Sequence, residues 1–290
     1  MRRSKTPEKT LMQMEVLNFQ MNRTLFNPAV FAYTLYVKFA DPRYWVIPLL
    51  LMTAPSFGLV LTMSFPHPPL TNELQKLIAG GIHHYLLQSV VYLLFAYMFI
   101  SDGPAGGKLV AEADSMSLLF TRPVTRFCYV LTRYLAAVVG TSILMLGALL
   151  LVYLVGLCYG ITAIDISLLT VATIVLNAAS WSSLVIFVHS APPLIAIVTV
   201  FILMGCAGVG NIYSQVEQST NAFLELLKTI CLFINEWFGD FMPTSIDLLA
   251  MSTASAFDIY ELAIFVSNIA FFILIAAFAL SCREFSYGSE

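Results

Sequence analysis

Few residues in this chain combine the types and spacing that catalysis or metal binding requires. His83 and His84 are adjacent, so on a helix their side chains diverge by about 100° and cannot share a metal ion as an i, i+4 pair would. The run DGPAGGK at residues 102–108 resembles half of a phosphate-binding loop, but Asp102 and Leu109 stand where that loop needs glycine and serine or threonine. The sequence therefore predicts no catalytic residue, no metal site and no cofactor bound by this chain.

A second set of polar residues lies inside long apolar stretches, where polar groups are costly and tend to face the interior of a helix bundle. These residues are Gln88, Asn177, Ser180, Ser183 and Asn268. They are candidates for the lining of a translocation path, and hydrogen bonding between helices explains them equally well. No Asp, Glu, Lys or Arg lies well within a predicted span, which argues against a carrier that relays protons or ions.

The composition determines the solvent that must surround these residues. Hydrophobic residues make up 59% of the chain and charged residues 11%, against about 25% charged residues in an average soluble domain. Too few polar groups remain to cover a water-facing surface. The sequence therefore predicts an integral membrane protein with lipids as partners and no nucleic-acid partner.

Six apolar stretches are long enough to cross the hydrocarbon of a bilayer, which takes about 20 residues of helix. They lie at about 44–66, 82–101, 130–157, 167–189, 193–213 and 259–281, within a transmembrane domain of residues 44–281. None shows the alternation of a strand, so helices are expected and the fold class is all-α. Pro48 and Pro55 should kink the first helix without ending it, because neighbouring helices can bond the freed carbonyls.

The distribution of Lys and Arg predicts how these spans are oriented. Twelve of the 14 Lys and Arg residues fall before the first span, around the segment between the second and third spans, or in the tail at 282–290. Only Lys76 and Lys228 fall on the other side. The positive-inside rule then places both termini in the cytoplasm.

Two segments outside the spans also carry helical patterns. Residues 1–43 form a cytoplasmic N-terminus that ends in PAVFAYTLYVKFAD, residues 28–41. This run predicts an elbow helix in the inner interface with Lys38 toward anionic lipid; a cytoplasmic helix packed on the bundle is the alternative. Residues 214–258 are too apolar for a soluble domain and predict a re-entrant or interfacial hairpin on the outer face.

The segment between the second and third spans is the most informative part of the chain. After DGPAGG, residues 108–121 resume a helical pattern, with apolar residues at spacings of four, three and four. A short amphipathic helix should therefore lie under the membrane. Its other face presents Glu112, Asp114 and Ser117 to the cytoplasm, where a partner of complementary charge could dock.

A corner should connect this helix to the third span. The residue before a proline avoids the helical region, so Thr121-Arg122-Pro123 ends the amphipathic helix. Pro123 then suits the first turn of the next helix, where its missing N–H is not needed. Arg126 and Arg133 follow, and we expect both at the inner headgroups.

The run from Glu112 to Arg126, followed by Tyr129, Arg133 and a long apolar helix, resembles the signature of the type-2 ABC transporter permeases. This six-span family includes bacterial multi-subunit exporters and the nitrous-oxide-reductase maturation permease. Its members have an acidic coupling helix after the second span and a leucine-rich segment, with a proline and an arginine, leading into the third. The elbow helix and the apolar hairpin before the last span are similar as well.

The resemblance implies a permease subunit, expected to be an exporter of the bacterial inner membrane. A separate ATPase subunit would bind ATP and Mg, and a second permease copy would complete the pore, as a homodimer or alternatively a heterodimer. The residues that the resemblance assigns to coupling with the ATPase are Glu112, Asp114, Ser117, Thr121, Arg122, Pro123 and Arg126.

Two other classes of function stay open at this point. A secondary transporter would have internal repeats and helices broken at matching positions, and the sequence shows neither. A membrane scaffold or assembly subunit of an ABC-like complex would fit the same pattern without transporting anything.

Overall fold

The computed structural model describes residues 25–40, 42, 45–64, 71–101, 125–162, 164, 166–216, 222–242, 245–253 and 259–282. Within these ranges the secondary structure is helical and contains no strand, which agrees with the predicted all-α class. The helices are α2 (Pro28–Ala40), α3 (Val46–Ser64), α4 (Asn72–Leu86), α5 (Ser89–Ile100), α7 (Arg126–Cys158), α8 (Leu168–Ser190), α9 (Pro193–Val216), α10 (Ala222–Phe238), α11 (Leu248–Thr253) and α12 (Ile259–Cys282), with a short 3₁₀ turn, η2, at Gly239–Phe241.

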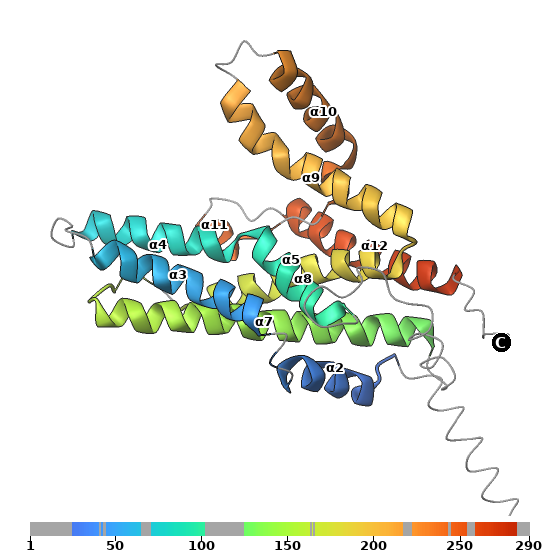
Figure 1. The fold of residues 1–290 in the computed structure, drawn as a ribbon, viewed down its shortest axis with the longest axis horizontal. Helices are drawn as coiled ribbons and strands as arrows, with labels where there is room; N and C mark the ends of the chain where they lie inside the picture. Colours follow the sequence, from blue (N-terminus) through green and yellow to red (C-terminus); the bar gives the residue numbers. More distant parts are fainter. Residues whose placement is uncertain are drawn as a thin grey trace, which may run out of the picture.

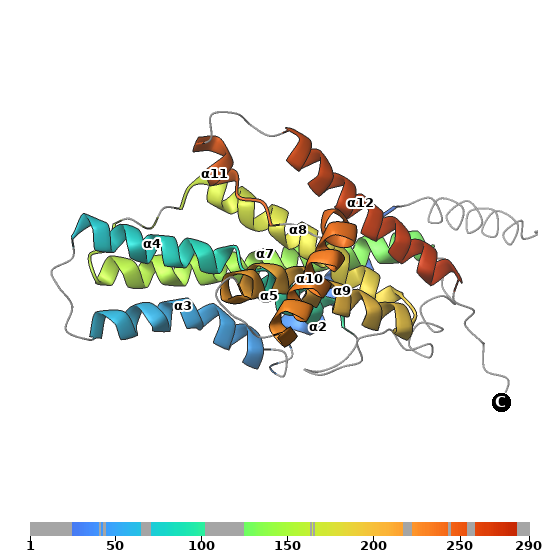
Figure 2. The ribbon, with the colours of Figure 1, turned by 90° about the horizontal axis from the view of Figure 1, so that it is seen from above.

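The long helix α7 runs along the long axis of the molecule (Figures 1 and 2). It packs on α3, α5 and α8, and α8 in turn packs on α12. The largest fully buried side chains of this bundle include Tyr92, Phe95 and Phe99 from α5 and Met145 from α7. Burial of such large apolar side chains gives the bundle one continuous core.

A glycine permits the close approach of α5 to α7. A Cβ atom at Gly140 would lie 2.3 to 2.5 Å from ring atoms of Phe99. Phe99 is fully buried and its ring also packs against Phe39 of α2, with ring centroids 5.4 Å apart. The missing side chain at Gly140 therefore lets three helices meet at one aromatic ring.

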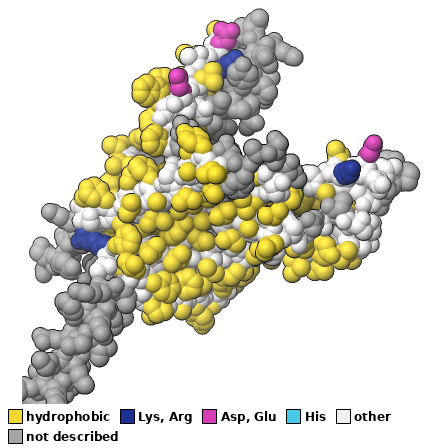
Figure 3. Space-filling model, turned by 180° about the vertical axis from the view of Figure 1, so that it is seen from behind, with side chains coloured by type: hydrophobic (Ala, Val, Ile, Leu, Met, Phe, Trp, Pro, Cys, Tyr) yellow, Lys and Arg dark blue, Asp and Glu magenta, His cyan; other side chains and the backbone are white. Residues whose placement is uncertain are grey.

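The outer surface of the bundle carries many large hydrophobic side chains. Large hydrophobic side chains of α3 are exposed, among them Leu49, Leu50, Phe57 and Leu61. Hydrophobic side chains cover the middle of the face seen in Figure 3, and the charged side chains drawn there lie at its ends and on the arm formed by α9 and α10. This is the surface expected of a chain whose solvent is lipid.

Five helical segments in the described part of the chain are long and apolar enough to cross a membrane: Val46–Ser64, Asn72–Ile100, Arg126–Cys158, Leu168–Ser190 and Ile259–Cys282. The protein is therefore a multi-pass helical membrane protein. The predicted span 193–213 lies in α9, whose described apolar stretch, Pro193–Leu203, is shorter than a span, so the sixth crossing stays a prediction.

The second span differs from the prediction of 82–101. Helix starts at Asn72, where Thr71 caps it by accepting a hydrogen bond from the Leu74 amide at 3.3 Å, and it breaks at Leu87–Gln88 before α5 begins. The polar character of the first turns, with Glu73 and Lys76, hides this part of the helix from a search for apolar runs.

Neither proline ends the first span, as predicted, but only Pro55 lies in the interior of the helix, so the kink expected at Pro48 is wrong. Pro48 lies in the first turn of α3, where no intrahelical partner is needed for the amide that it lacks. Pro55 lies inside the helix and deprives the Leu51 carbonyl of its usual donor. The hydroxyl of Tyr85 in α4 donates to that carbonyl instead, so a neighbouring helix bonds the freed group.

Three helices, α9, α10 and α2, lie outside the core of the bundle. Helices α9 and α10 pack against each other and project away from the bundle as an arm (Figure 1). Helix α2 packs on α7 and α5, with Tyr33 and Tyr36 exposed. The bounds of α2 match the predicted elbow helix, but Lys38 is only 5% exposed, so the expected orientation of its side chain toward lipid is wrong.

Candidate functional site

The predicted coupling residues lie mostly outside the described part of the chain. Glu112, Asp114, Ser117, Thr121, Arg122 and Pro123 belong to residues 102–124, which the structure leaves undescribed. The residues at both ends of this segment, Ser101 and Thr125, are described, and so is Arg126.

Two cationic side chains bond the backbone at the end of α5, directly before segment 102–124. The Nζ atom of Lys38 in α2 donates to the Ser101 carbonyl at 2.6 Å. The guanidinium of Arg133 in α7 donates to the Ile100 carbonyl and, at 2.9 Å, to the hydroxyl of Tyr129. Cations are stabilising at a helix C-terminus because the last carbonyls carry partial negative charge and have no partner within the helix. The end of α5 is thus tied to both α2 and α7.

The position of Arg133 corrects a prediction from the sequence. We expected its side chain among the inner headgroups, but it is only 7% exposed. The carbonyls at the end of α5 provide acceptors inside the protein, and the Tyr129 ring lies 5.6 Å from the guanidinium carbon. These partners replace the water and lipid phosphates that the charge would otherwise need.

The downstream end is bonded to the end of α12. Thr125 caps α7, since its hydroxyl accepts from the Cys128 amide at 3.2 Å. Arg126 donates to the carbonyls of Leu280, at 3.2 Å, and Ser281. Together Lys38, Arg126 and Arg133 form a helix-end clamp, in which each cation bonds the last carbonyls of a membrane helix. Ser101 and Thr125, the described residues on either side of segment 102–124, both lie at this clamp.

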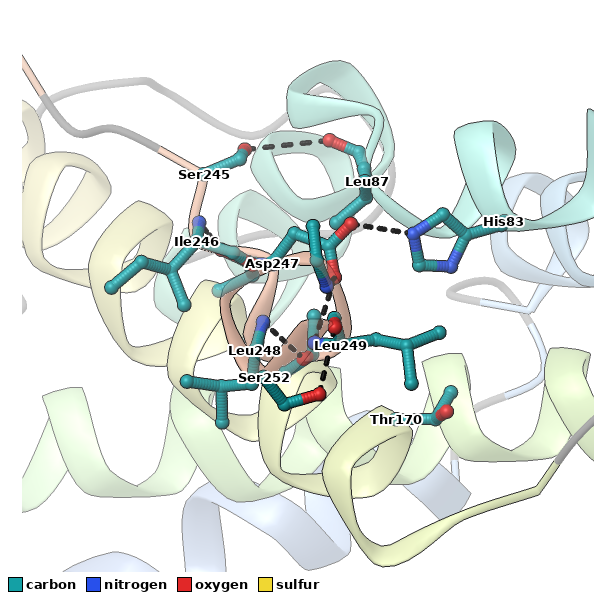
Figure 4. A network of polar contacts seen from close by, with 12 residues as sticks. His83, Leu87, Thr170, Ser245, Ile246, Asp247, Leu248, Leu249 and Ser252 are labelled. Atoms are coloured by element: carbon teal, nitrogen blue, oxygen red, sulfur yellow. Dashed lines mark hydrogen bonds and ion pairs between the residues drawn. The ribbon is translucent and has the colours of Figure 1, made fainter. Parts of the chain in front are cut away.

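A second group of polar contacts surrounds Met242 and residues 245–253. We call these residues the docked segment. Its backbone bonds side chains of α8 and α12. Figure 4 shows two of its other contacts, that of Asp247 with His83 and that of Ser245 with Leu87. Asn177 of α8 donates to the Ile246 carbonyl at 2.9 Å and accepts from the Ile246 amide at 2.8 Å. Asn268 of α12 donates to the Met242 carbonyl at 3.2 Å. Asn177 is fully buried and Asn268 nearly so.

Further bonds join the docked segment to α8 and to the break between α4 and α5. Thr173 accepts from the Leu248 amide at 3.1 Å. The hydroxyl of Ser245 accepts from the indole of Trp181 and donates to the Leu87 carbonyl, both at 3.3 Å. Leu87 lies where the helix is interrupted, so its carbonyl is available to a partner from outside α4.

An ion pair completes this set of contacts. The Nε2 atom of His83 in α4 lies 2.7 Å from a carboxylate oxygen of Asp247. Asp247 also caps α11, accepting from the amides of Leu249 at 3.0 Å and Ala250 at 3.1 Å. Burial acts to raise the pKa of Asp247, but the hydrogen bond from His83 and these two amides outweigh it and lower the pKa.

The direction of this shift decides when the contacts of Asp247 stabilise the protein. A lowered pKa in the folded state means that the stabilisation is present above the ordinary value of 3.8 and is lost as the pH falls through the lowered value.

A cavity of about 270 Å³ adjoins the ion pair. Its walls come from α4, α7, α8 and α11 and are mostly apolar, with His83 and Thr170 as polar members. Gly80 lines it, and a Cβ atom at that position would meet no atom within 4 Å. Among the described residues no three His, Cys, Asp or Glu side chains are grouped as metal ligands.

The predicted path residues separate into three groups. Asn177 and Asn268, which are far apart in sequence, come together at the docked segment. Ser183 donates to the Ser180 carbonyl at 2.6 Å within α8. Gln88 is exposed at the break before α5 and provides no side-chain cap to that helix.

Sequence reasoning missed the other members of this region, above all His83 and Asp247. These two residues are 164 positions apart, and no local pattern relates them. Asp247 carries one usable signal, because Asp is a preferred residue directly before a helix.

Comparison of the chain with models of protein families, with curated proteins and with solved structures found no match.

Proposed function

We propose that this chain is the permease subunit of an ABC transporter, that it acts as an exporter of the bacterial inner membrane, and that a separate ATPase subunit drives it. The proposal is carried by the run from Glu112 to Arg133, which resembles the coupling segment of type-2 permeases. The anchoring of both ends of segment 102–124 in the helix-end clamp supports it.

The clamp is suited to transmit force from a partner into the bundle. A push on residues 108–121 would reach α7 at Arg126, which holds α12 as well. It would reach α5 at Ser101, which Lys38 holds to α2. Four helices would then move as connected bodies, as in rigid-body switching between two packed states.

The length of α7 also suits it to transmit force from a partner. Its 33 residues extend about 50 Å at 1.5 Å per residue, against about 30 Å of hydrocarbon. A helix of this length projects beyond the hydrocarbon, so a displacement at its first turn is carried along a rigid rod. In our proposal two permease copies, identical or homologous, form the path between them.

A double charge reversal tests the docking of the ATPase. Changing Glu112→Lys together with Asp114→Lys should abolish the stimulation of ATP hydrolysis by this chain, because two complementary contacts become repulsive. The matched control is Glu225→Lys with Glu236→Lys, two exposed acids of α10, which should leave the stimulation unchanged. If both double variants stimulate hydrolysis like the original chain, docking at residues 108–121 is wrong.

A simpler experiment tests the partner itself. The tagged chain is purified in mild detergent from its own cells, and the bound proteins are examined for a subunit with a phosphate loop and ATPase activity. We expect such a subunit in a one-to-one ratio with this chain. A chain that stays stable and alone while its candidate ATPase is present would refute the permease function and favour a scaffold.

A further inference from the structure

The docked segment is non-helical where it lies deepest. Asn177 is the ninth residue after Leu168 in α8, and Asn268 is the ninth after Ile259 in α12. At 1.5 Å per residue, both amides lie about 14 Å from the starts of their helices. Both bond the backbone of the docked segment, so this segment reaches about half the depth of the hydrocarbon.

Backbone at this depth must have partners, since an unpaired N–H or C=O in hydrocarbon costs several kcal/mol. Here the partners of the backbone are side chains of α8 and α12. An apolar helix would need none of these polar residues. Thr173, Asn177 and Asn268 thus form a polar seat that the docked segment covers.

From this geometry we propose that the docked segment is a movable gate, seated on Thr173, Asn177 and Asn268 and latched by the His83–Asp247 ion pair. The inference rests on the proposed function, because a gate implies a path. When the segment lifts, the three seat residues exchange its backbone for water or substrate. The predicted path residues Asn177 and Asn268 therefore line the path only in the open state.

The latch is suited to open because it is more accessible than the seat. The side chains of His83 and Asp247 are 32% and 22% exposed, whereas those of the seat are buried. The adjoining cavity is lined by Leu249 of α11 and by Gly80 of α4, and it provides space into which α11 can shift. A partly exposed bond beside free volume marks the place where the segment begins to move.

Thiol labelling of the full chain in right-side-out membrane vesicles tests this gate. The five native cysteines are replaced, and Thr173→Cys reports on the seat, with a charged maleimide that does not cross membranes as the probe. His83→Ala should raise the labelling rate about tenfold, the effect of losing one charge-assisted hydrogen bond. Asp247→Ala should raise it at least as much, because this change also removes the cap of α11. The double variant should label no faster than Asp247→Ala alone, because His83→Ala removes a bond that Asp247→Ala has already removed.

Two controls separate a gate from general loss of structure. His84→Ala removes an exposed imidazole next to the latch and should leave labelling unchanged. Ala137→Cys reports on the fully buried core of α7 and should stay unreactive in every latch variant. Unchanged labelling of Thr173→Cys in the latch variants would overturn the gate. An equal rise at Ala137→Cys would overturn it too, since the ion pair would then support the whole bundle.

The same reporter distinguishes the gate from its coupling to ATP. This labelling needs no ATPase, so a positive result stands even if no ATPase subunit binds the chain. When the ATPase and ATP are enclosed within the vesicles, at the cytoplasmic face, hydrolysis should raise the labelling rate of Thr173→Cys in the cysteine-replaced chain with an intact latch. If latch variants open the seat but hydrolysis does not, the gate is retained and the ATP-driven function is refuted.

Discussion

The bond between Tyr85 and the Leu51 carbonyl makes a quantitative prediction about how this bundle tolerates a proline in a span. Tyr85→Phe removes only the hydroxyl that donates to Leu51. That carbonyl lacks its usual donor because Pro55 has no N–H. An unpaired buried carbonyl costs about 1 to 3 kcal/mol, and bonds between membrane helices average about 0.6 kcal/mol. Because Tyr85 is half-buried, we expect a loss of about 1 kcal/mol.

A double-mutant cycle isolates this bond from other effects of the phenol. In the Pro55→Ala background the residue at position 55 has an N–H that can bond the Leu51 carbonyl along the helix. Tyr85→Phe should then have almost no effect on stability, and the coupling between the two changes should be about 1 kcal/mol. Tyr159→Phe serves as the matched control, because Tyr159 lies beyond the end of α7 and has no role in this bond.

The free energy of unfolding of all four variants is measured by titrating the protein in mixed micelles with a denaturing detergent. If Tyr85→Phe destabilises the protein equally with and without Pro55, the hydroxyl does not compensate for the proline. A loss of the same size in Tyr159→Phe would show that removing any phenol hydroxyl has this effect.

Three further predictions concern the packing of α5 and the two polar regions. Gly140→Ala should destabilise the protein by about 1 to 3 kcal/mol, because the added Cβ would overlap the Phe99 ring. Gly58→Ala should be tolerated, because a Cβ there meets no atom within 4 Å. Equal free energies of unfolding for the two variants would contradict this prediction. Asn177→Ala should speed hydrogen exchange at the Ile246 amide more than tenfold, since a lost bond of about 1.4 kcal/mol is a factor of ten; unchanged exchange would show that Asn177 does not hold the segment. Lys38→Met keeps the length of the side chain but removes the charge at the end of α5. The free energy of unfolding should fall by about 1 to 2 kcal/mol, and amide hydrogen exchange in α2 should become faster. An unchanged stability would show that apolar contacts alone hold α2 to the bundle.

Local pattern was enough to predict the helices. A run of about 20 apolar residues can satisfy its backbone in lipid only as a helix, so the spans near 44–66, 130–157, 167–189 and 259–281 could be assigned from composition alone. The N-terminus of the second span could not, since Glu73 and Lys76 interrupt the apolar pattern while the backbone continues as helix. The sequence predicted that a neighbouring helix would bond the carbonyl freed by Pro55, because such a carbonyl in a membrane needs a donor. It did not identify Tyr85 as that donor.

The sequence by itself determined the solvent, the class of fold and the candidate coupling segment, because these depend on hydrophobicity and on residues close along the chain. Only the tertiary structure decided what the isolated charges and amides do. Lys38 and Arg133 bond helix ends inside the protein, where the sequence suggested lipid. Asn177 and Asn268 hold one buried segment, and His83 meets Asp247 across 164 residues. Such pairs form because buried polar groups must find partners, and distance along the chain does not restrict which partner folding brings near.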